Sequence, residues 1–103
     1  MSILIIRLRG VDQGGGPDAV AEESGALARA LESLGDEYPY LSCIDSYGLT
    51  TFNRLQAKRL LMELERARSE PSFTHLQDII DRVAGLAQRC AGEVDVYLEF
   101  EGD

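Results

Sequence analysis

The sequence lacks tryptophan, contains a single histidine, and has only two cysteines. It shows no CxxC pair and no cluster of cysteine and histidine at zinc-ligand spacing, so we expect neither a metal centre nor a cofactor. The cysteines, Cys43 and Cys90, stand in apolar surroundings and are predicted to be small buried thiols. No apolar run is long enough to cross a membrane.

Positive charge is also scarce. Lysine and arginine total 10 against 18 aspartates and glutamates, a formal net charge of −8. Such a surface repels phosphate groups, so we expect no binding to nucleic acid or to an anionic membrane. A basic protein would be attracted, although the same charge can serve solubility alone. The opening MSILIIRLRG has its arginines after its apolar run, the reverse of a secretion signal, which predicts a cytoplasmic protein.

The length of 103 residues predicts a single domain, and strands are predicted near both ends of the chain. Residues 2–9 are mainly apolar and β-branched, with arginines at 7 and 9, and they offer a candidate edge for pairing with a second copy. Residues 94–100 alternate, with Val94 and every second residue after it facing the core. Four charged side chains are expected to pair across these two strands: Arg7, Arg9, Asp95 and Glu99.

A helix and a hairpin are predicted after the first strand. Pro17 suits a first helical turn, and apolar residues at helical spacing continue to Leu34, just before a glycine. The hairpin has arms at 40–44 and 49–52, joined by a turn from Asp45 to Gly48.

Two further helices complete the pattern. Residues 54–70 follow Thr51 or Asn53 as the cap, with a mixed-charge outer face that includes Glu63. The last helix is predicted from a capping box of Thr74 and Gln77. The order strand, helix, hairpin, helix, helix, strand indicates an α+β fold. We expect three or four mostly antiparallel strands, with the helices mainly on one face.

The residues that could carry catalysis lack the partners that a reaction needs. The glycine-rich loop GVDQGGGPD lacks the lysine and hydroxyl of a phosphate-binding loop. His75 could pair with Asp78, but that spacing is common on solvated helices, and no nucleophile accompanies it. No calcium-loop pattern groups the acidic residues. We therefore expect no catalytic residue and no enzyme.

Acidic residues and tyrosines gather in the middle of the chain, in two short segments. Tyrosine is favoured in protein interfaces because it buries a large area and keeps a polar group. We predict that an acidic, aromatic surface contacts a basic protein through Asp36, Glu37, Tyr38, Asp45 and Tyr47.

A resemblance extends this interpretation. The chain resembles a group of small bacterial proteins of similar length at Ile44, Asp45, Tyr47, Gly48, Thr50 and residues 52–56, and again at its ending, Leu98, Phe100, Gly102 and Asp103. It departs from that group at Ser46 and Leu49. The small, acidic format is also similar to immunity proteins of polymorphic toxin systems, which implies an inhibitor that covers the active site of a basic toxin. The alternative hypothesis is a self-associating regulatory or structural protein without catalytic activity.

Overall fold

The structure, a computed structural model, describes residues 3–10 and 19–102. The glycine-rich loop therefore lies mostly outside the described residues. The elements follow one another as β1 (Leu4–Gly10), β2 (Ala19–Glu22), α1 (Ala26–Glu32), β3 (Leu49–Phe52), α2 (Arg54–Ala67), the 3-10 turn η1 (Pro71–Phe73), α3 (Gln77–Gly92) and β4 (Val96–Gly102).

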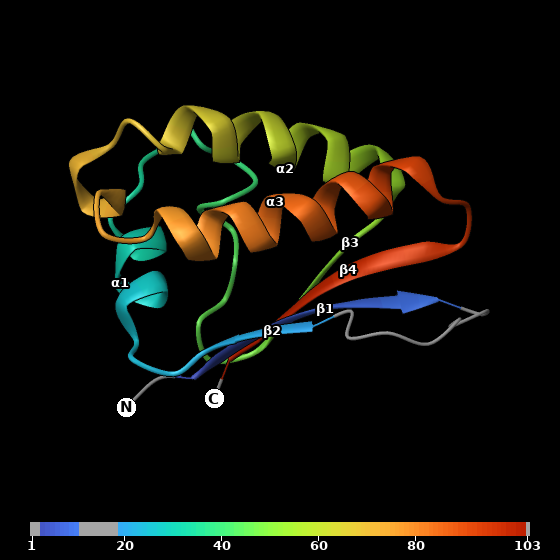
Figure 1. The fold of residues 1–103 in the computed structure, drawn as a ribbon, viewed down its shortest axis with the longest axis horizontal. Helices are drawn as coiled ribbons and strands as arrows, with labels where there is room; N and C mark the ends of the chain where they lie inside the picture. Colours follow the sequence, from blue (N-terminus) through green and yellow to red (C-terminus); the bar gives the residue numbers. More distant parts are fainter. Residues whose placement is uncertain (1–2, 11–18, 103) are drawn as a thin grey trace.

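The four strands form one sheet in the order β2-β1-β4-β3, and every neighbouring pair is antiparallel. Helices α2 and α3 lie side by side over one face of this sheet (Figure 1). The predicted α+β class, the antiparallel sheet and the three helices are confirmed. The first strand is not an edge, however, because β1 lies between β2 and β4, and the edges are the four-residue strands β2 and β3.

The first helix begins later than predicted. Residues 19–22 form β2, which pairs with the otherwise open side of β1, and α1 starts only after Gly25 adopts a left-handed φ of 81°. An acidic residue before this helix, Glu22, caps its start: the Glu22 carboxylate accepts hydrogen bonds from the backbone N–H groups of Ser24 and Leu27. It thus supplies acceptors for N–H groups that a helix start leaves unpaired.

The predicted hairpin arm at residues 40–44 is also wrong, because this segment forms turns instead of a strand. Only β3 pairs with β4 on that side of the sheet. The carboxylate of Glu63 explains the different path: it accepts hydrogen bonds from the backbone N–H groups of Tyr40 and Leu41 at 2.9–3.1 Å. Glu63 is buried on the inner side of α2, and its placement on the charged outer face was an error.

The helix caps agree with the sequence at α2 and disagree at α3. Asn53 and Gln56 form a reciprocal capping box at the start of α2. The predicted box of Thr74 and Gln77 does not form. Thr74 instead donates to the carbonyl of Pro71, and the Gln77 amide donates to two backbone carbonyls upstream.

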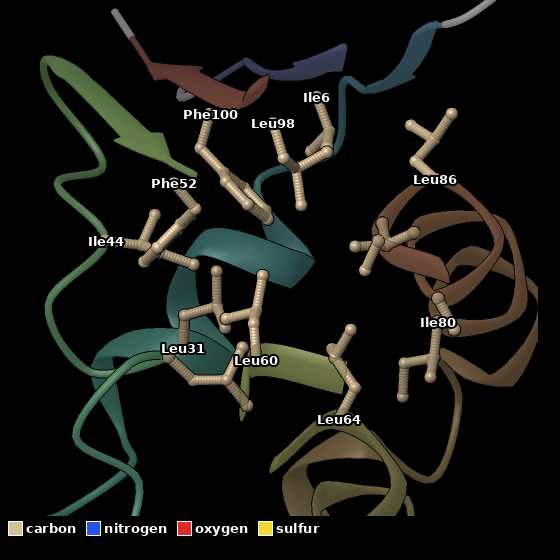
Figure 2. Packing of buried hydrophobic residues seen from close by; sticks show 14 of the residues in the cluster. Ile6, Leu31, Ile44, Phe52, Leu60, Leu64, Ile80, Leu86, Leu98 and Phe100 are labelled. Carbon is tan, nitrogen blue, oxygen red and sulfur yellow. The ribbon is translucent and has the colours of Figure 1, made fainter. Parts of the chain in front are cut away.

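The core fills the space between the sheet and the helices (Figure 2). Phe52 and Phe100 come from adjacent strands and meet edge to face, with ring centroids 5.7 Å apart. Their side chains point toward the helices that carry Leu60 and Ile80 (Figure 2). Val94 lies outside this core with 71% of its surface exposed, because β4 begins only at Val96.

Candidate protein-binding surface

The turn from Asp45 to Gly48 is present as predicted and is fixed by its own hydrogen bonds. The N–H of Gly48 donates to the carbonyl of Asp45 at 3.3 Å, and an Asp45 carboxylate oxygen accepts from the N–H of Tyr47 at 2.9 Å. The N–H of Asp45 donates in turn to the hydroxyl of Thr50 on β3. A Cβ at Gly48 would lie 2.5 Å from the Asp45 carboxylate, so a side chain there would force this carboxylate to move.

The end of β4 holds the same turn from the other side. The N–H of Gly102 donates to the carbonyl of Gly48 at 2.9 Å. A Cβ at Gly102 would lie 1.9 Å from the carbonyl oxygen of Ser46, so only glycine allows this close approach. The turn is therefore held against the sheet by backbone contacts that lie far apart in the sequence.

Two large apolar side chains project from this fixed base. Tyr47 is 70% exposed, and Leu49, the first residue of β3, is 58% exposed. Successive strand residues face opposite sides of the sheet. Phe52 faces the core, so Leu49, three positions earlier, faces away from it. We call residues 45–49 the tip. Its exposed tyrosine was predicted; Leu49 was missed, although the alternation with Phe52 could have revealed it.

The structure separates the remaining predicted contact residues from the tip. Asp36 and Glu37 are exposed, but they lie beside the C-terminal end of α2, where the carbonyl of Glu37 accepts a hydrogen bond from Arg66. The tip instead contacts the end of β4. The two groups therefore sit at opposite ends of the connection between α1 and β3 (Figure 1).

Tyr38 is buried, which corrects the expectation that its ring faces outward. Its hydroxyl donates to Glu70 at 2.8 Å, and the guanidinium of Arg66 lies over its ring, 4.7 Å from the centroid. Burial raises the pKa of Tyr38, and the bond to Glu70 raises it further. Tyr38 therefore fixes the connection to α2 and offers no ring to a partner.

Charged residues also border the tip on the face of the sheet that the helices leave uncovered. Leu49 is the cross-strand neighbour of Glu101. Arg7 pairs with Glu101 at 2.7 Å and with Glu99 at 3.1 Å, and Arg9 lies 3.9 Å from Glu99. The predicted pairing of the arginines with Glu99 is confirmed. Their second acidic partner is Glu101, however, and not Asp95 as predicted.

The two thiols differ. Cys90 is buried as predicted, but Cys43 is exposed, and neither forms a disulfide. Burial raises the pKa of Cys90. The pKa of Cys43 is also raised, because neighbouring protein atoms partly desolvate its thiol and the Glu63 carboxylate lies nearby.

His75, the other candidate for chemistry, is exposed and lies between two open hollows of about 330 and 280 Å³. Asp78 lines the larger one, together with Glu22, whose carboxylate is occupied by backbone N–H groups. Within residues 3–10 and 19–102, His75 makes no hydrogen bond or ion pair, and no three acidic, cysteine or histidine side chains group as metal ligands. No helix in this part of the chain is long and apolar enough to span a membrane.

Comparison of the chain with protein-family models, with curated proteins and with solved structures finds no match.

Proposed function

We propose that this protein is a non-catalytic binding module of the immunity type, which acts in the cytoplasm by binding and occluding a basic toxin or enzyme. The observation that carries the proposal is the tip: a phenol ring 70% exposed and a leucine 58% exposed, two positions apart in the sequence on a turn fixed at both ends. Exposing this much apolar surface at one place favours a partner that covers it.

The fixed turn matters for affinity. Association costs conformational entropy for each side chain and loop that becomes ordered, and a preorganised base removes the loop's share of that cost. The turn bonds to Thr50, and Gly48 bonds to Gly102, so the backbone of the tip is set before the partner arrives. Tyr47 can then fill a pocket of the partner as an anchor.

The net charge of −8 provides the attraction to a cationic surface and raises the rate of encounter. Asp36 and Glu37 lie away from the tip, so we assign them to long-range steering rather than to the central contact. Asp45 lies within the tip. Its carboxylate already accepts from the Tyr47 N–H, but it keeps free lone pairs for a cation.

A photo-crosslinking amino acid in place of Tyr47 tests the proposal in the native host. The matched control places the same group at Tyr97, which is 46% exposed on the opposite end of β4. We expect one basic protein to be captured from position 47 and not from position 97. Capture of no protein, of an acidic protein, or of the same set from both positions would contradict the proposal.

The captured partner then allows kinetic measurements. We expect the association rate to fall as salt rises, and the Asp45→Lys, Tyr47→Ala double variant to lose binding. A salt-insensitive rate or full affinity of this variant defeats the proposal. Sedimentation of the protein alone adds a third check, because a stable dimer without a partner favours the self-association hypothesis.

A further inference from the structure

Helix α2 presents a surface whose charge is opposite to that of the rest of the chain. Residues 46–62 form the longest stretch of the sequence without Asp or Glu, although acidic residues outnumber basic ones by 18 to 10. The first two turns of α2 lie in this stretch and carry three exposed cations, Arg54, Lys58 and Arg59. Within the described residues these three cations have no ion-pair or hydrogen-bond partner.

Two exposed apolar side chains belong to the same surface. Leu55 is 64% exposed and Met62 is 68% exposed. They are seven positions apart, so they share one face of the helix, with Lys58 and Arg59 between them. The opposite face, which includes Ala57, is buried in the core, so the fold itself holds this surface outward. We call residues 54, 55, 58, 59 and 62 the α2 stripe.

Helix stability does not account for the α2 stripe. The N-terminal end of a helix carries partial positive charge, so acidic residues are preferred in the first turn and a cation there, such as Arg54, is unfavourable. The first turn of α2 contains no acidic residue. By contrast, the next turn pairs Glu65 with Arg68 at 3.0 Å, the ordinary arrangement of a solvated helix face. The stripe has no such ion pair within the part of the chain that the structure describes, and neither capping nor charge pairing within α2 explains its exposed cations and apolar side chains.

We infer that the α2 stripe is a second docking surface, which binds an acidic protein segment with apolar side chains, such as an acidic amphipathic helix. The cations meet the carboxylates of that segment, and Leu55 and Met62 contact its apolar side chains. A protein segment fits better than nucleic acid because Leu55 and Met62 need apolar partners, which a phosphate backbone lacks. Its few carboxylates also meet less of the repulsion that the net charge of −8 exerts on the dense phosphates of nucleic acid or of an anionic membrane. This surface is distinct from the tip and does not depend on its function.

The test is a titration of the ¹⁵N-labelled protein with a synthetic helical peptide of about 18 residues, or five turns, rich in Glu with Leu at positions i, i+3, i+4 and i+7. We expect chemical-shift changes concentrated at residues 54–62. A peptide with every Leu replaced by Ser should bind at least tenfold more weakly. Changes elsewhere, no changes, or equal binding of the serine peptide would overturn the inference.

Matched variants separate the stripe from overall charge. Lys58→Glu with Arg59→Glu should weaken binding of the peptide at least tenfold, as should Leu55→Gln with Met62→Gln. The control, Arg29→Glu with Arg82→Glu, changes the net charge equally at exposed sites outside the stripe and should stay within about twofold. An equal loss in the control variant would refute the assignment.

Other occupants give different signals at the same resonances. Stronger shifts with single-stranded DNA or with phosphatidylserine-containing vesicles would replace the protein segment by a phosphate ligand. Shifts at residues 54–62 that depend on protein concentration without peptide would replace it by a second copy of this chain. Either result overturns the inference.

Discussion

The buried carboxylate of Glu63 should be among the most costly side chains to remove. It accepts hydrogen bonds from the backbone N–H groups of Tyr40 and Leu41, the shortest of which is 2.9 Å. Glu63 is only 6% exposed, on the side of α2 that faces the core. These bonds fasten the connection between α1 and β3 to the helix layer. Glu63→Ala leaves both N–H groups without their acceptor.

The size of the effect follows from these contacts. An unsatisfied buried N–H costs about 1–3 kcal/mol, and two donors are affected, so we expect Glu63→Ala to lower the free energy of unfolding by about 3 kcal/mol. Glu63→Gln keeps one acceptor oxygen and should cost about half as much. Urea unfolding followed by far-ultraviolet circular dichroism measures both changes, since the chain has no tryptophan to report on its fluorescence.

Glu65→Ala is the matched control because Glu65 stands on the same helix with its side chain exposed. Loss of its surface ion pair with Arg68 should cost about 0–1 kcal/mol. The reasoning fails if Glu63→Ala costs no more than this control, because the carboxylate would then not hold the connection.

Three further predictions concern the tip, the thiols and the alkaline limit of stability. Gly102→Ala should lower the free energy of unfolding in urea by about 2 kcal/mol, because the new Cβ would displace the carbonyl of Ser46 and break the hydrogen bond from Gly102 to Gly48. A change near zero would contradict the close approach of Gly102 to the turn. In native protein a thiol reagent should modify Cys43 alone, slowly because its pKa is raised, and Cys90 only after unfolding; equal rates would contradict the burial difference. The pKa of Tyr38 is higher in the folded protein than its ordinary value of 10.0, so the protonated phenol stabilises the fold. This contribution is fully present below pH 10.0 and is lost as the pH rises toward the folded-state pKa. Urea unfolding above about pH 10 should therefore show a decline that Tyr38→Phe removes, and an identical decline in both proteins would refute it.

Much of the fold could be predicted where one periodicity dominates. The alternation in residues 94–100 indicates β4, although the strand begins two residues later, at Val96. The helical spacing of apolar residues indicates α2 and α3 directly. The cap at Asn53 could also be predicted, because it needs only the local sequence and Gln56 three residues on.

The missed elements depend on contacts that are distant in the sequence. Residues 19–22 form a strand only because β1 offers a free side, whereas Val20 also fits a helical pattern with later leucines. The path of residues 40–44 depends on Glu63, and a glutamate on a helix ordinarily predicts an exposed side chain. Contacts distant in the sequence also decided which predicted binding residues are exposed. A tyrosine within a turn, Tyr47, could be predicted to be exposed, whereas the burial of Tyr38 depends on Arg66 and Glu70.

The most direct test of the proposed function is the affinity of the crosslinked partner for Tyr47→Ala, measured beside Tyr97→Ala. An interface anchor costs about 2 kcal/mol when truncated, so we predict that the dissociation constant rises about 30-fold for Tyr47→Ala and stays nearly constant for Tyr97→Ala. An unchanged dissociation constant for Tyr47→Ala would contradict the central claim that the tip is the docking surface.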